Sequence, residues 1–308
     1  MNRTISDILV IVGLFLVLGA FCATGWLALP QEGNAVLPAL AAIGIIIVNS
    51  ALLYLVNERL LSGTSLLVAV IYFVLATARP QALYYTPVHA ASLLLTLSIV
   101  CYLHFNSMRT SMKYLVGAWA SLGAAALILP PLAWLAPVYA IFSFGKTEDK
   151  LRFWVAALLS LLLPLAAWTG ICYLRGESSV GAILQSLWEG MCAVQRPSFH
   201  YSAATMARML LTAVAAVVAV IRVVRRLDSY KIAQYHACLR LIILSISLCV
   251  LALLFFASPA IPSGLLTLIP VAPLLGEYLS HPVREKGTGL FALVLILLLV
   301  VERISCFV

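Results

Sequence analysis

Long apolar runs separated by short polar segments recur along the whole chain. A helix that crosses a membrane needs about 20 apolar residues, because each residue advances about 1.5 Å through a hydrocarbon core of about 30 Å. Eleven runs approach or reach this length, at residues 8–29, 35–56, 60–78, 87–105, 114–129, 131–144, 153–173, 207–224, 241–257, 261–279 and 288–301. The pattern predicts an all-α fold, a polytopic transmembrane helix bundle with about eleven spans.

The two runs on either side of Pro130 and Pro131 are short for full spans, and the positive charges decide how we interpret them. Cytoplasmic loops of membrane proteins collect Lys and Arg. If the chain begins in the cytoplasm and turns at these prolines, 14 of the 19 Lys and Arg residues are cytoplasmic; a single span over 114–144 would leave 8 there. The residues then outside are Arg79, Arg175, Arg196, Arg208 and Arg303. We therefore predict a cytoplasmic N-terminus and a C-terminus outside.

The composition leaves no room for a separate soluble domain. Hydrophobic residues make up 64% of the chain and charged residues 10%, whereas soluble domains have about 25% charged residues. Residues 1–308 are therefore expected to form a single integral membrane domain. The net charge of +8 comes from short clusters, of which the basic cytoplasmic segment 222–240 is the clearest. We expect membrane lipids with anionic headgroups as partners at the cytoplasmic face, and no nucleic acid.

Nothing in the sequence indicates a metal or a cofactor. The seven cysteines are scattered, mostly inside apolar runs, without any C-x-x-C pair, so no zinc site or disulfide framework is readable. The Gly-rich motifs that cradle phosphates are absent too. We expect neither a metal site nor a bound cofactor.

The longest outward loop, 175–206, contains a predicted surface helix at residues 180–191. Apolar residues recur there at spacings of three and one, and polar residues take the other face, which is the pattern of an amphipathic helix. We expect this outward interfacial helix to lie on the membrane surface, with Trp188 at headgroup depth and turned toward the spans.

Polar side chains inside the spans are few. The ionisable ones fall near span ends, where long side chains reach the headgroups; they are Glu277, Arg222, Arg240, Arg208 and Glu302. This disfavours proton-coupled or ion-coupled transport. The deepest polar groups are expected to form hydrogen bonds between helices; they are Asn49, Ser50, Ser121, Ser263 and Thr267. Small residues at 117, 121 and 123 are expected to let helices approach closely.

Two of the predicted spans contain proline pairs, Pro131 with Pro137 and Pro270 with Pro273. Proline removes a backbone donor, so each run must kink or break unless neighbouring groups satisfy the freed carbonyls. Transporters place binding sites at such breaks, although packing kinks are also common in membrane helices.

Five outward residues carry chemistry that could form a site. They are Glu32, Arg79, His89, Arg196 and His200. The arginine guanidinium matches phosphate geometry, and histidine titrates near neutral pH. We predict Glu32 and His89 as catalytic bases, and Arg79, Arg196 and His200 as substrate-binding residues. Simple solvation of each side chain is the alternative.

The chain resembles an uncharacterised family of polytopic inner-membrane proteins from bacteria with a two-membrane envelope. The resemblance covers the middle third, with His89 and the run after it, Leu122-Gly123 through Leu129-Pro130-Pro131-Leu132, and residues 152–164. It implies a multi-pass protein of the bacterial inner (cytoplasmic) membrane.

A looser similarity is to the C-type glycosyltransferases, which take sugars from polyprenyl-phosphate carriers. It rests on the many spans, the outward surface helix and the short basic cytoplasmic loops. It implies a polyprenyl-phosphate-linked substrate and a catalytic acid in the first outward loop, where Glu32 stands. The usual acidic pair is missing here.

Three functions stay open. The first is an enzyme or accessory that handles lipid-linked envelope precursors or glycoconjugates; if it is an enzyme, a membrane glycosyltransferase-like transferase is expected. The second is a small-molecule transporter, and the third is a non-catalytic scaffold or assembly subunit. The rich chemistry of the outward loops favours the first function. The sequence gives no oligomeric state.

Overall fold

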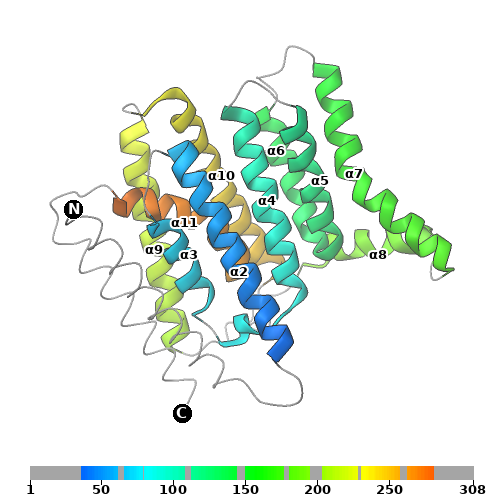
Figure 1. The fold of residues 1–308 in the computed structure, drawn as a ribbon, viewed down its shortest axis with the longest axis horizontal. Helices are drawn as coiled ribbons and strands as arrows, with labels where there is room; N and C mark the ends of the chain where they lie inside the picture. Colours follow the sequence, from blue (N-terminus) through cyan, green and yellow to red (C-terminus); the bar gives the residue numbers. More distant parts are fainter. Residues whose placement is uncertain are drawn as a thin grey trace, which may run out of the picture.

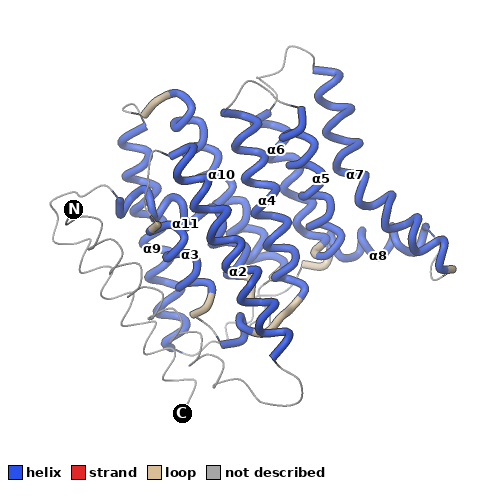
Figure 2. The backbone as a smooth tube through the Cα atoms, viewed as in Figure 1, coloured by secondary structure: helices blue, strands red, loops and turns tan. Residues whose placement is uncertain are grey.

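A computed structural model describes residues 36–61, 66–78, 80–107, 112–143, 150–176, 180–194, 203–227, 230–256 and 262–280. Every element in this part of the chain is helical (Figures 1 and 2). The α-helices are α2 (Val36–Val56), α3 (Leu67–Ala76), α4 (Pro87–Ser107), α5 (Met112–Ile128), α6 (Leu135–Ser143), α7 (Lys150–Arg175), α8 (Val180–Cys192), α9 (Ala203–Arg226), α10 (Ile232–Phe255) and α11 (Gly264–Ser280). Short helical turns are η1 (Asn57–Leu61), η2 (Pro80–Leu83) and η3 (Pro130–Trp134). The predicted all-α class is confirmed for these residues.

Four of the helices are long and apolar enough to cross a membrane. They are Leu37–Val56, Pro87–Phe105, Leu151–Arg175 and Ile232–Phe255, and they indicate a membrane protein. The predicted spans 8–29 and 288–301 lie outside the described residues. The predicted span 60–78 is shorter in the structure, because α3 begins only at Leu67, after a Ser- and Gly-containing segment in which helix propensity is low.

The chain reverses at Pro130 and Pro131, as the charge distribution predicted. Pro130 opens η3, and Leu129 before it has an extended backbone with φ −130° and ψ 89°, the conformation that a following proline favours. Helix α6 then returns beside α5, so that Tyr139 meets the edge of Trp119 with a centroid distance of 6.1 Å. A single span over 114–144 is therefore excluded.

Helix α11 is continuous through Pro270 and Pro273. It packs against α3, α9 and α10. Its approach to α3 depends on Gly276, since a Cβ atom there would collide with the side chain of Val68. Helix α11 therefore contains both prolines without a break and packs in the core of the bundle.

Two glycines of α5 also allow close contacts with α4 and α7. A Cβ atom on Gly123 of α5 would collide with the backbone carbonyl of Leu161 on α7, and one on Gly117 would lie 3.2 Å from the sulfur of Cys101 on α4. The predicted role of these two glycines in close helix packing is confirmed.

Helix α7 diverges from the bundle toward its C-terminal end, and α8 lies across that end (Figure 1). Pro164 lies within α7, and prolines are a usual cause of helix bending. The predicted helix in the 175–206 loop is confirmed as α8. Its contact with the bundle was predicted wrongly: Trp188 is 62% exposed, whereas Gly190 lies against Pro130 and the Met191 carbonyl accepts a hydrogen bond from Trp134 Nε1 at 3.2 Å.

Candidate functional site

Of the five residues predicted to form an outward site, the structure places His89. Residues Glu32, Arg196 and His200 lie outside the described part of the chain, and so does Arg79. Whether the five share one cavity therefore stays a prediction. Among the described residues, no group of three His, Cys, Asp or Glu side chains could hold a metal ion.

His89 is buried in the first turn of α4, and both of its ring nitrogens are hydrogen-bonded. The backbone N–H of Thr86 donates to Nδ1 at 3.1 Å, so Nδ1 is the acceptor nitrogen. Nε2 then carries the proton and donates to the carbonyl of Ala82 at 2.7 Å. The imidazole thus ties η2 to the start of α4, which is a structural arrangement.

Another polar group, deeper in the bundle, joins α2, α3 and α4. The amide Nδ2 of Asn49 donates to the hydroxyls of Tyr72, at 3.1 Å, and Ser92, at 3.0 Å. All three side chains are fully buried. Asn49 was predicted to form hydrogen bonds between helices, and the contacts confirm that prediction.

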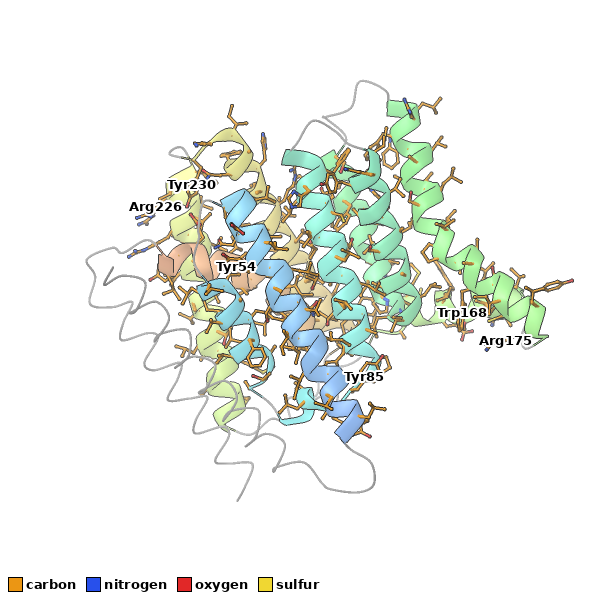
Figure 3. All side chains as sticks on the ribbon, in the orientation of Figure 1. Tyr54, Tyr85, Trp168, Arg175, Arg226 and Tyr230 are labelled. Carbon is orange, nitrogen blue, oxygen red and sulfur yellow. The ribbon has the colours of Figure 1, made fainter. Side chains whose placement is uncertain are left out.

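A small cleft lies at the end of the bundle where α9 stops and α10 starts. It is lined by Arg222, Val223, Arg226, Tyr230, Glu277 and Tyr278. Figure 3 shows Arg226 and Tyr230 close together at this end. Two arginines four residues apart share one face of a helix, so the sequence of α9 directs both toward the cleft. Arg225, between them, is exposed.

Tyr230 and Glu277 connect the two sides of this cleft. The tyrosine hydroxyl donates to Glu277 Oε1 at 3.0 Å, and the glutamate is only 2% exposed. Burial raises the pKa of Tyr230, and the negative charge of Glu277 raises it further. The phenol therefore stays protonated and remains the hydrogen-bond donor. The positive end of Arg222 lies 5.2 Å from the ring centroid of Tyr278, within the range of a cation–π contact.

Two ionisable residues that we predicted to reach the headgroups are instead buried in the bundle. Glu277 bonds to Tyr230, and Arg240 is 5% exposed on α10. The prediction failed because we began that helix at Leu241, whereas α10 begins at Ile232. The missed signal is the spacing of Ala237, Arg240, Leu244 and Leu248, which puts the arginine on the buried stripe.

No family model, curated protein or solved structure matches this chain. The two resemblances drawn from the sequence stay expectations, and the site must be interpreted from its own geometry.

Proposed function

We propose that this chain is a multi-pass protein of the bacterial inner membrane that handles lipid-linked envelope precursors. The proposal includes eleven spans, a cytoplasmic N-terminus and a C-terminus outside. It is supported by the four long apolar helices and by the Lys and Arg distribution in the sequence. In it, the phosphate of a polyprenyl-phosphate carrier is the group that the protein recognises.

The observation that carries the proposal is the cleft at the end of α9. Two guanidinium groups, two tyrosines and the carboxylate of Glu277, which is hydrogen-bonded to Tyr230, line it. The adjoining surface of α9 is apolar, with exposed Val217, Val218 and Ile221. A lipid phosphate has the same two parts, a charged head and an apolar chain. Arginine suits the head, because its planar fork matches phosphate oxygens.

For a transferase step on the outward side, the proposal keeps Glu32 as the base and Arg79, Arg196 and His200 as substrate-binding residues. A general base needs a lone pair within reach of the proton it removes. His89 uses its lone pair on the Thr86 N–H, so we assign it a structural role rather than that of the base.

Retention of lipid by the purified full chain tests the cleft. The protein in maltoside micelles would be incubated with polyprenyl phosphate or with the matching polyprenol, and bound lipid measured by native mass spectrometry. We expect retention of the phosphate and little of the alcohol. Arg222→Gln and Arg226→Gln should each weaken retention about tenfold, the factor for a loss of about 1.4 kcal/mol.

Arg225→Gln is the matched control, since it removes the same charge from the same helix turn but from an exposed position. Equal losses for all three variants would mean that only the net charge matters. Equal retention of polyprenol and polyprenyl phosphate would show that the protein does not recognise the phosphate. Sidedness is tested separately with reporter fusions that are active only outside the cytoplasm. They should be silent after Lys150 and active after Val308.

A further inference from the structure

Arg240 is a buried positive charge inside a helix that is long and apolar enough to cross a membrane. It is 5% exposed, and it lies within the candidate span Ile232–Phe255. An ionisable side chain in such a position is costly unless it is paired, and it is retained where it has a role.

The described residues offer Arg240 an aromatic face but no acid. Its guanidinium carbon lies 5.8 Å from the ring centroid of Tyr102. Three acidic residues belong to the described part of the chain. Glu58 and Glu189 are exposed, and Glu277 is hydrogen-bonded to Tyr230. No hydrogen bond or ion pair joins Arg240 to any described residue.

The aromatic rings around Arg240 are themselves fixed. Tyr102 stacks on Tyr139 with a centroid distance of 4.1 Å and an interplanar angle of 16°. The Tyr102 hydroxyl donates to the Tyr139 carbonyl at 3.3 Å, and the hydroxyls of Tyr139 and Ser98 are hydrogen-bonded at 3.1 Å. This stack supports the guanidinium through its π-face. No nitrogen of Arg240 is among the buried side-chain atoms that lack a partner, so its N–H donors are open to acceptors from outside the bundle.

The position of Arg240 points to the source of those acceptors. It lies eight residues after the start of α10, or about 12 Å along the helix axis. Side chains of a helix lean toward its N-terminus, so the guanidinium reaches back toward the end of the bundle where α9 stops. Arg222, Arg225, Arg226 and Lys231 gather at that end, and such a cluster attracts anions.

We propose that Arg240 binds a phosphate oxyanion, carried by a lipid headgroup or free in solution, which enters from the end of the bundle where α10 begins. The guanidinium donates to the phosphate oxygens, and the Tyr102 ring holds it in place. This site is separate from the α9 cleft and does not depend on the proposed function.

Thermal unfolding of the purified full chain in maltoside micelles, in chloride buffer free of phosphate, tests the proposal. Two probes distinguish the sources of phosphate: inorganic phosphate, and dioctanoylphosphatidic acid compared with dioctanoylglycerol. We expect a saturable rise in the midpoint with at least one phosphate probe and none with the glycerol. A rise in the midpoint with inorganic phosphate would identify the ligand of Arg240 as a free anion. A rise with phosphatidic acid alone would identify it as a lipid headgroup.

Variants attribute the effect to Arg240. Arg240→Met should abolish the rise, and without phosphate its midpoint should equal or exceed that of the wild type, because an unpaired buried charge has been replaced by an apolar side chain of similar length. Arg240→Lys should retain part of the rise. Arg152→Met, which removes an exposed positive charge from α7, should retain all of it.

Three results would overturn the proposal. They are no midpoint change with either phosphate probe, an equal rise in Arg240→Met, and a clear fall in the phosphate-free midpoint of Arg240→Met, which would identify Arg240 as one half of a structural ion pair. If Arg240→Met does not fold, the titrations of the wild type and Arg240→Lys still decide: a rise in both, smaller in the lysine variant, supports the proposal.

Discussion

Two buried ionisable side chains, Glu277 of α11 and Arg240 of α10, differ in what surrounds them. Glu277 accepts a hydrogen bond from the Tyr230 hydroxyl, which fastens α11 to the segment that leads into α10. Arg240 has the ring of Tyr102 beside it and no acceptor among the described residues. A buried charge with a bonded partner contributes to the fold, whereas one without an acceptor among the described residues is a candidate for binding a ligand.

Among the variants that test this comparison, removal of the Glu277 carboxylate should have the largest effect on the free energy of unfolding. Glu277→Ala deletes the acceptor of Tyr230 and should lower the free energy of unfolding by about 3 kcal/mol, the upper range for hydrogen bonds to charged groups. Equilibrium unfolding in mixed micelles measures it. Glu58→Ala is the control, because Glu58 is exposed and should change stability by less than about 0.5 kcal/mol. Similar losses would mean that burial of Glu277 is irrelevant.

The next effect concerns the packing that positions Glu277. Gly276→Ala forces a Cβ atom into Val68 and should cost about 2 kcal/mol through overpacking. Gly44→Ala meets no atom within 4 Å, and should stabilise α2 by up to about 1 kcal/mol through helix propensity. A pair of variants with the same sign would contradict the close contact between α3 and α11.

Removing only the donor should have a smaller effect. Tyr230→Phe keeps the ring and deletes the hydroxyl that bonds to Glu277, which should lower the free energy of unfolding by about 1.5 kcal/mol. Tyr235→Phe, in the same segment, removes a hydroxyl that bonds to no described residue, and should be neutral within about 0.5 kcal/mol. Equal values for the two variants would argue against the Tyr230 bond.

The same hydroxyl predicts a pH dependence. Burial and the Glu277 charge raise the pKa of Tyr230 above its ordinary value of 10.0. Near that pH the unfolded chain loses the proton and the folded chain keeps it, so the stabilisation is complete well below pH 10 and declines as the pH rises through 10. Between about pH 9.5 and 11, wild-type stability should fall more steeply than that of Tyr230→Phe. Parallel curves would assign the decline to other groups.

The smallest effect is expected on α8, far from α10. Gln185 donates to Glu189 at 2.9 Å on the exposed face of that helix. Pairs of this kind contribute about 0.2–0.5 kcal/mol, so Glu189→Ala should change the free energy of unfolding by no more than about 0.5 kcal/mol. A larger loss would show that α8 packs more tightly than its exposed side chains indicate.

The long apolar helices also differ in their surroundings, because some are buried within the bundle and others are exposed on its outside. The span Pro87–Phe105 is 67% buried within the bundle, whereas Leu151–Arg175 is 17% buried, although both are similarly apolar sequences. In a membrane, lipid satisfies an apolar face as well as a neighbouring helix does. Hydropathy therefore predicts that a segment enters the bilayer but not what it contacts there. Trp168 and Arg175 project from the outer part of α7 (Figure 3).

Local features of the sequence determined much of this protein. Periodic hydrophobicity predicted most helices, including α8; the distribution of Lys and Arg predicted the turn at Pro130; and the small residues predicted close helix packing at Gly117 and Gly123. Each of these signals can be followed along the sequence without knowing which residues meet in space. The tertiary structure alone decided that Glu277 meets Tyr230 and that Arg240 faces Tyr102. Those contacts join residues 47 and 138 positions apart. The role of an ionisable group depends on which partner packing brings to it, because the same charge is solvated at a helix end and costly inside the bundle.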